Sequence, residues 1–205
     1  ILIRLEDDGM LSEFKLDKGS MQLINKDMVD LITMRTQNLE KVKVSGGSAS
    51  NTIHALAKLG IETRMIGKIG EDETGRFFKE DMEMNHIDAC LLSGKTLSGR
   101  AMTFISPDSE RTFGTFLGAA VELTDADLNE ELFRGYSYFH IEGYLVQNNA
   151  LIEKALKLAK EAELKVSIDM ASYNVVEDNL DFLKKMVNKY VDIAFLNEEE
   201  AQAFT

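Results

Sequence analysis

Hydrophobic and polar residues follow two different periods in different parts of the chain. In residues 1–45, and again in residues 100–120, apolar and polar positions alternate, which is typical of strands with one buried face. A helical pattern over Lys26–Met34 interrupts the first of these parts. The predicted early strands are Ile1–Leu5, Met21–Ile24 and Val42–Val44.

A hairpin is predicted around Pro107, the only proline of the chain. The alternating runs "RAMTFI" and "RTFGTFL" flank "SPDSE". Proline presets φ for a turn, and Asp108 and Ser109 can close it with local hydrogen bonds.

The rest of the chain consists of short apolar runs, each followed by a helical pattern. "TRMIGKIG" precedes "ETGRFFKEDMEMNHI", and "SYFHIEGYLV" precedes "NALIEKALKLAKEAEL", in which Leu151, Ala155, Leu158 and Ala159 share one face. "LKVSIDM" precedes "EDNLDFLKKMVNKY", and "VDIAFL" precedes "NEEEAQAF". This alternation predicts βαβ units and a parallel sheet, hence one α/β domain with a small additional β layer.

Composition excludes several classes of function. The chain of 205 residues is 44% hydrophobic and has a net charge of −12, which opposes nonspecific binding of nucleic acid or anionic membranes. No apolar stretch reaches the length of a membrane span. The single Cys90 excludes an internal disulfide and suits a reducing compartment, so we expect a cytoplasmic protein. The spacing of His54, His86 and His140 relative to Cys90 is not that of a zinc site.

Ligands of open parallel sheets bind beyond the carboxyl ends of the strands. The segments that follow the predicted strands are polar or contain glycine. They are Gly67–Gly70, Glu142–Tyr144, Asp169–Ser172 and Asn197–Glu200.

The stretch "VSGGSASN" places two glycines directly before a helix. Gly46 and Gly47 can adopt positive φ and leave room for a ligand, and Ser48, Ser50 and Asn51 offer polar side chains at a helix N-terminus. The pattern matches neither of the common phosphate-binding glycine motifs, and a neutral polyol suits these groups better. A glycine turn with a Ser or Asn cap is the alternative interpretation.

The stretch "NEEEA" also has two interpretations. Asn197 as the N-cap with Glu200 three residues later forms a capping-box pattern. Glu200 is in addition a candidate partner of Mg²⁺ through a bound water, because magnesium keeps several of its waters.

Two arginines flank the predicted hairpin turn. Arg111 and Arg100 can contact an anionic substrate group or a transferred phosphoryl group. They can equally be solvated charges at a sheet edge.

The stretch "SGGSASNTIHALAKLGIETRMIGKIGEDETGRFF", Ser45–Phe78, resembles the first signature of the PfkB carbohydrate kinase family, also called the ribokinase family. The signature combines a di-glycine, an Asn, an Ala-rich helix that ends in Leu-Gly, and a G-x-x-G-x-D-x-x-G turn. The matching residues are Gly46, Gly47, Asn51, Leu59, Gly60, Gly67, Gly70, Asp72 and Gly75.

The resemblance implies a three-layer α/β/α domain of ribokinase-like fold with a β-sheet lid. The lid would come from about residues 1–6, 20–25, 41–45 and 100–120, and the α/β core from the remainder of residues 1–205. The resemblance also implies an ATP-dependent kinase for a primary hydroxyl of a sugar or nucleoside. ATP and Mg²⁺ are then the expected cofactors, and a monovalent cation is a further candidate. The oligomeric state is open, and exposed lid strands could pair at their edges to form a homodimer.

Site residues follow from the same resemblance, position by position. Gly46, Gly47, Ser48 and Asn51 are similar to the contacts with sugar hydroxyls. Asn197 and Glu200 resemble the N-x-x-E motif associated with magnesium and phosphate, and Arg111 resembles a cleft arginine. The residues similar to lid and pocket positions beside the base or sugar are Gln22, Ile24, Phe113, Leu117 and Tyr144.

The sequence departs from the family pattern in two places. The substrate-binding aspartate of the first lid strand would lie just before Ile1. The D-T-x-G-A-G-D signature with the general base aspartate is absent and is expected beyond Thr205, so we expect an incomplete domain of a longer protein. A noncatalytic sugar- or nucleoside-binding protein is the alternative to a kinase. "GSMQLI" and "RTFGTFLGAA" resemble the adenosine-kinase branch more than ribokinase or fructokinase.

Overall fold

The computed structural model describes all residues, Ile1–Thr205, and divides them into two compact units. Unit 1 contains Ile1–Gly46, Gly67–Met84 and Leu91–Glu122. Unit 2 contains Gly47–Ile66, Asn85–Cys90 and Leu123–Thr205. Strands β4 (Thr63–Ile69) and β5 (Ile87–Ser93) pair with each other, and each runs from one unit into the other.

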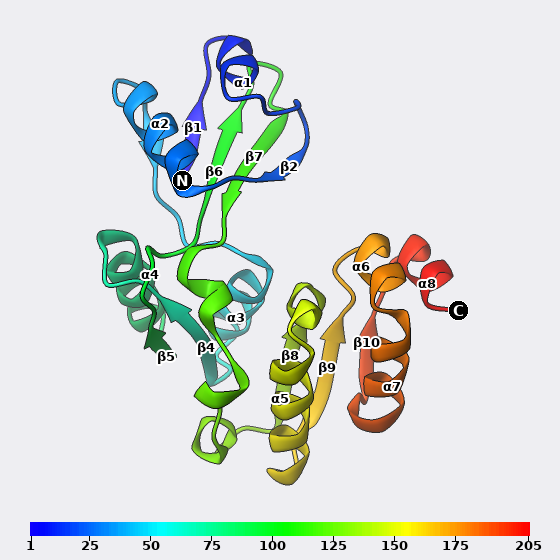
Figure 1. Ribbon diagram of the computed structural model, residues 1–205. Helices are drawn as coiled ribbons and strands as arrows, with labels where there is room; N and C mark the ends of the chain where they lie inside the picture. Colours follow the sequence, from blue (N-terminus) through cyan, green and yellow to red (C-terminus); the bar gives the residue numbers. More distant parts are fainter. The chain divides into compact units, whose positions relative to one another are not determined.

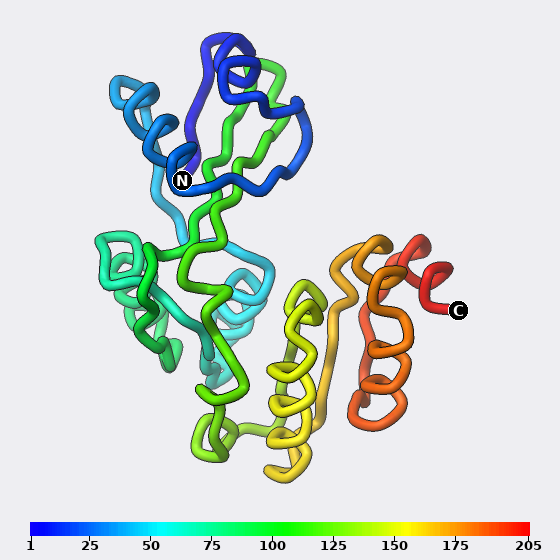
Figure 2. Tube along the Cα trace, in the orientation of Figure 1, coloured from blue at the N-terminus to red at the C-terminus, as the bar shows by residue number.

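Unit 1 contains a five-stranded sheet with the order β2-β7-β6-β1-β3. Its central strands β1 and β6 are about a hundred residues apart in sequence and pair in parallel, Ile3 opposite Phe104 (Figure 2). The strands are β1 (Leu2–Arg4), β2 (Met21–Leu23), β3 (Lys41–Val42), β6 (Arg100–Ile105) and β7 (Arg111–Phe116). The helical segments are α1 (Gly9–Glu13), α2 (Lys26–Arg35), α4 (Glu73–Met84) and the 3₁₀ helix η1 (Gly118–Glu122).

One face of this sheet packs against α1 and α2 (Figure 1). The core between them contains Ile3, Leu11, Ile32, Met102 and Phe104, all at most 3% exposed. Since burial of apolar surface is the main favourable term in folding, this core fixes the sheet to its two helices.

Unit 2 contains a parallel sheet with the order β10-β9-β8. Its strands are β8 (Tyr138–Glu142), β9 (Lys165–Asp169) and β10 (Ile193–Phe195). The helices are α3 (Ser48–Lys58), α5 (Asn149–Glu161), α6 (Tyr173–Asp178), α7 (Leu180–Tyr190) and α8 (Glu198–Phe204). The 3₁₀ segments are η2 (Asp125–Asp127), η3 (Glu130–Phe133) and η4 (Gly143–Gln147).

The predicted elements are largely confirmed. The hairpin around Pro107 forms, with Ile105 opposite Arg111. The parallel sheet forms from β8, β9 and β10, but β4, which we expected in the same series of βαβ units, instead pairs with β5 in a separate sheet. Leu151, Ala155, Leu158 and Ala159 are all buried on α5, which contacts β9.

Some details differ from the predictions. Strand β3 ends at Val42 rather than Val44, and the structure adds α1, α6 and β5, which the sequence pattern did not indicate. Helices α1 and α6 span one or two turns, too short for a period to be recognised. None of the helices combines the length and the apolar composition that crossing a bilayer requires.

The predicted division into a lid and a core is not decided by the two units. Unit 1 contains the four segments expected to form the lid, and it also contains α4, which we assigned to the core. The single incomplete domain therefore stays a prediction.

Candidate functional site

The N-terminus of α3 is formed by a glycine without a side-chain cap. Gly47 is the N-cap residue with a φ of 100°, and no side chain accepts a hydrogen bond at this end. A Cβ atom on Gly47 would meet no heavy atom within 4 Å. The interpretation as a Ser or Asn cap is therefore wrong, because the glycine itself caps the helix and the first-turn amides have no side-chain partner.

The three polar residues of this first turn differ in their surroundings. Asn51 is exposed, whereas Ser50 is only 2% exposed and its hydroxyl lies 3.4 Å from His54 Nδ1. Ser50 therefore does not present its hydroxyl to solvent, in contrast to our expectation. Ser48 and Asn51 remain the candidate ligand contacts of α3.

Glu142 is a candidate that the sequence analysis did not single out. It ends β8, which α3 contacts, and it is 9% exposed. Its Oε1 lies 3.5 Å from His140 Nε2, while its buried Oε2 has no hydrogen-bond partner. An unpaired buried carboxylate oxygen is costly, so this atom points to a missing donor. The signal in the sequence is an acidic residue that ends an apolar strand.

The pKa of Glu142 lies below its ordinary value. His140 is the largest influence and lowers the pKa of this carboxyl, burial raises it, and the Ser48 hydroxyl lowers it again. Glu142 is therefore ionised at neutral pH and can only accept hydrogen bonds.

The carboxyl ends of the three parallel strands lie along one edge of the unit 2 sheet. Glu142 is opposite Asp169, and Asp169 is opposite Phe195, two residues before Asn197. Tyr144 follows Glu142 in η4, is 50% exposed, and donates a hydrogen bond from its hydroxyl to the carbonyl oxygen of Ala171 at 3.4 Å. Such an edge is where ligands of open α/β sheets bind.

Asn197 and Glu200 form the predicted capping box at the start of α8. Asn197 Oδ1 accepts from the Glu200 amide at 2.9 Å, and Glu200 Oε2 accepts from the Asn197 amide at 3.0 Å. Asn197 Nδ2 donates to Glu200 Oε1 at 2.9 Å, and Glu200 is 6% exposed. The local role of this pair is thus confirmed.

The donor set around Glu200 fits a hydrated metal ion rather than a directly held one. The structure contains no group of three or more His, Cys, Asp or Glu side chains arranged to hold a metal. Each oxygen of Glu200 accepts one hydrogen bond from Asn197, and a carboxylate oxygen has a second lone pair. A water of a magnesium shell can be accepted there without breaking the capping box.

The remaining predicted residues belong to unit 1 and lie on two different faces of its sheet. Phe113 pairs with Met21, and Arg111 lies over the Phe113 ring at 5.9 Å, so these three share one face. Gln22 pairs with Gly114, and Ile24 packs on the core under α1 and α2, so these two lie on the opposite face. Gln22 and Ile24 therefore cannot line one pocket together with Phe113. Leu117 follows β7 and is exposed.

Arg100 and the second half of the signature have a structural role within unit 1. Asp72 accepts hydrogen bonds from the Gly75 amide, the Ser98 amide and hydroxyl, and Arg100. A Cβ on Gly70 would lie 2.7 Å from the Ser98 amide nitrogen. A Cβ on Gly75 would lie 2.6 Å from the hydroxyl oxygen of Ser98. The signature glycines therefore permit this close approach.

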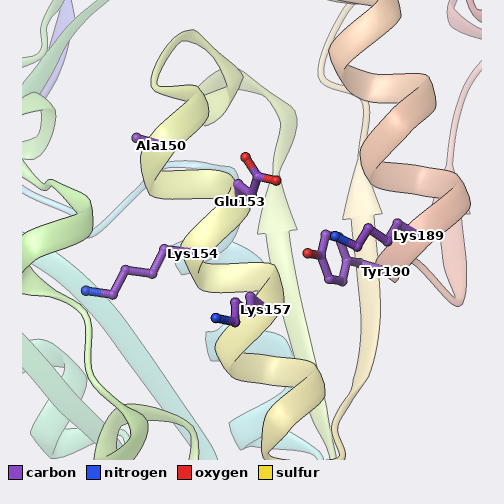
Figure 3. Close-up of a pocket in the computed structure, with 6 residues that line it drawn as sticks. All are labelled: Ala150, Glu153, Lys154, Lys157, Lys189 and Tyr190. Atoms are coloured by element: carbon purple, nitrogen blue, oxygen red, sulfur yellow. The ribbon is translucent and has the colours of Figure 1, made fainter.

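A groove between α5 and α7 contains none of the predicted site residues (Figure 3). Its lysines have partners of their own, for example Lys154, which donates to the carbonyl oxygen of Asp125 at 2.7 Å. The groove is lined by Ala150, Glu153, Lys154, Lys157, Lys189 and Tyr190.

A helix N-terminus and polar strand ends lie beside a parallel sheet here, and in open α/β folds this edge is where small molecules bind. Residues 24–205 match the family described as pfkB family carbohydrate kinase, and the chain belongs to this family. Guanosine-inosine kinase of Escherichia coli strain K12 is 24% identical over 212 residues, which cover 97% of this chain and 49% of that protein.

Two solved structures are similar over the whole chain. Adenosine kinase from Sinorhizobium meliloti is 31% identical with a TM-score of 0.81, covering 99% of this chain and 64% of that one. A probable sugar kinase from Rhizobium etli CFN 42 is 28% identical with a TM-score of 0.83, covering 100% and 63%. These structures confirm the predicted ribokinase-like α/β fold. The chain spans about half the length of the guanosine-inosine kinases it matches.

Proposed function

We propose that the full-length protein is an ATP-dependent kinase that phosphorylates a primary hydroxyl of a nucleoside, with a purine nucleoside such as adenosine favoured over ribose or fructose. Family membership supports the reaction class. The similarity to an adenosine kinase and to a guanosine-inosine kinase supports the acceptor class.

One observation of the structure carries the proposal. The uncapped N-terminus of α3 offers donors, and the buried, unpaired Oε2 of Glu142 on the neighbouring strand offers an acceptor. Vicinal hydroxyls of a ribose both donate and accept, so they match this pair of partners. A phosphate would be repelled by the ionised Glu142, which favours the neutral end of a nucleoside at this place.

The proposed mechanism assigns positioning to the residues of this chain. Ser48, Asn51 and Glu142 hold the acceptor's hydroxyls and thereby orient the reacting primary hydroxyl, and Tyr144 of the same unit contacts the base or sugar. Positioning is the larger part of catalysis in phosphoryl transfer, since the protein does little covalent work. Glu200 would hold a hydrated Mg²⁺, which when bound neutralises charge on the phosphates of ATP.

A phosphorylation screen tests this proposal. The full-length protein is incubated with labelled ATP and Mg²⁺ and with adenosine, guanosine, inosine, ribose or fructose, and the position of the new phosphate is determined by NMR. We expect transfer to the 5′ hydroxyl of a purine nucleoside and none to 5′-deoxyadenosine, which lacks that hydroxyl. Binding of adenosine without transfer to any acceptor would instead identify a noncatalytic binding protein.

A further inference from the structure

Three side chains in neighbouring positions of β8 and β9 form a chain of polar contacts. His140 is opposite Ser167 in the parallel register, and its Nδ1 lies 2.9 Å from the Ser167 hydroxyl oxygen. Its Nε2 lies 3.5 Å from Oε1 of Glu142, two residues further along the same strand. The ring also meets the edge of Phe195 in a T-shaped contact with centroids 6.2 Å apart. Both ring nitrogens of His140 therefore face polar partners, and Phe195 packs against the same ring.

The two partners are suited to a particular form of the imidazole. A neutral histidine has one donor and one acceptor nitrogen. If the Ser167 hydroxyl donates to Nδ1, the proton resides on Nε2 and is directed at Glu142. A carboxylate prefers such a donor over the bare nitrogen, so both contacts favour the same tautomer.

We infer that His140, oriented by Ser167, is a positioning residue that fixes the orientation of the Glu142 carboxylate, an inference that rests on the proposed function. Glu142 touches the acceptor, and His140 acts through it. The residue types suit this task, because Oε1 of Glu142 lies 3.5 Å from His140 Nε2 whereas the buried Oε2 has no hydrogen-bond partner.

Other charged and titratable groups face this pair from the neighbouring elements. Asp169 is opposite Glu142 on β9, and its Oδ1 accepts from the Ala171 amide at 2.8 Å. Helix α3, which contacts β8, contributes Ser48 and His54, whose Nδ1 lies 2.8 Å from the carbonyl oxygen of Ser50. Among the surroundings of Glu142, His140 is the largest influence on its pKa and lowers it, while burial opposes this effect.

This arrangement has a consequence for pH dependence. His140 is the largest influence that lowers the pKa of Glu142, and burial opposes it. Without His140, burial dominates and the carboxyl takes up its proton at higher pH. Glu142 would then lose its free acceptor oxygen in a pH range where the wild type still has it.

The test compares His140→Phe, His140→Gln and Ser167→Ala in the full-length protein, with His86→Gln as a matched control at an exposed histidine. Adenosine is the probe, and KM and kcat are measured for adenosine and for ATP from pH 3.5 to 8.5, a range extended to low pH because the pKa of Glu142 is lowered. In parallel, the titration of the Glu142 side-chain carbon is followed by ¹³C NMR, with assignment through Glu142→Gln.

We expect His140→Phe to raise the KM for adenosine about tenfold at pH 7.5, with an unchanged KM for ATP. The acidic limb of its kcat/KM profile and the Glu142 titration should both move to higher pH. His140→Gln retains a donor and should stay within about threefold of the wild-type KM. Ser167→Ala removes only a hydroxyl and should change KM in the same direction as His140→Phe, by less.

The inference is overturned if His140→Phe leaves the Glu142 titration where it is in the wild type, whatever acceptor the protein uses. It is also overturned if the KM and pH profile of His140→Phe match those of His86→Gln. The proposed function fails separately, by the absence of phosphoryl transfer in the wild type.

Discussion

The carboxylate of Asp72 pairs with the guanidinium of Arg100 at 3.1 Å, joining the segment before α4 to the first residue of β6. Both side chains are largely buried, at 15% and 16% exposure. A second pair, Lys43 with Glu73, connects the end of the β3 segment to the first turn of the same helix. The aspartate of the signature therefore anchors α4 to the strands of unit 1.

Replacement of Asp72 by Asn should destabilise the protein by about 2 kcal/mol, because Arg100 would lose its charged partner while remaining buried. Burial raises the pKa of Asp72, but hydrogen bonds from Ser98 and Gly75 and the charge of Arg100 lower it by more than burial raises it. The pKa of Asp72 therefore lies below its ordinary value. The stabilisation is therefore present above about pH 4 and is lost as the pH falls through the lowered folded-state pKa. Thermal unfolding between pH 3 and 7 measures both effects. Glu73→Gln, at an exposed position, is the control, and an equal Tm for the two variants would contradict the anchor.

Gly47→Ala and Gly46→Ala should separate backbone strain from ligand access. Gly47 has a φ of 100°, so alanine there costs about 1–3 kcal/mol, whereas Gly46 has no positive φ and its replacement leaves stability nearly unchanged. A Cβ at either position projects into open space, where we propose that the acceptor binds. Both variants should therefore raise the KM for adenosine. A stable Gly46→Ala protein with the wild-type KM would show that no ligand approaches this turn.

Asn51→Ala should raise the KM for adenosine by about tenfold or more, because it removes an amide proposed to bind the ribose hydroxyls. The side chain is exposed on α3, so we expect little change in Tm. Thr52→Ala, also exposed and on the same helix, is the matched control and should behave like the wild type. Equal affinities of Asn51→Ala and Thr52→Ala for adenosine in calorimetry would contradict the proposed contact between Asn51 and the ribose.

Substitutions of Phe113 and Gln22 should affect different properties, because the two side chains lie on opposite faces of one sheet. Phe113→Ala is expected to raise the acceptor KM, because Phe113 resembles a lid position of the family and an aromatic side chain there is lost. Gln22 Oε1 accepts from the Asp17 amide at 2.7 Å and from the Ser20 hydroxyl at 3.1 Å, so Gln22→Ala should lower Tm without changing KM. Kinetics and thermal unfolding on both variants decide this, and a raised KM for Gln22→Ala would refute the placement by register.

Glu200→Gln should distinguish capping from metal binding. Glutamine keeps one oxygen for the Asn197 amide, so the stability loss should be about 1 kcal/mol, but the charge for a hydrated Mg²⁺ is lost. The Mg²⁺ concentration for half-maximal activity should rise several-fold, and Asn197→Ala should lower Tm. An unchanged magnesium requirement in Glu200→Gln would leave this residue with its capping role alone.

Local chemistry could be predicted from the sequence with success. The capping box of Asn197 and Glu200 and the buried stripe of α5 depend on residues three or four positions apart, where helix geometry dictates the contact. The hairpin around Pro107 likewise depends on adjacent residues. The change from strand-like to helix-like periods was sufficient to predict the α/β fold class.

Contacts over long separations were decided only by the tertiary structure. Gln22, Ile24 and Phe113 were all expected beside the base or sugar, but the register pairs Phe113 with Met21, so Gln22 and Ile24 lie on the other face, since side chains alternate along a strand. The partners of Asp72 and His140 include Arg100, 28 residues from Asp72, and Ser167, 27 residues from His140 on the neighbouring strand, and no local pattern specifies which groups will meet there. The sequence thus determined which elements form, because their periods and caps are local, whereas burial and register across strands determined which polar groups became the candidate site.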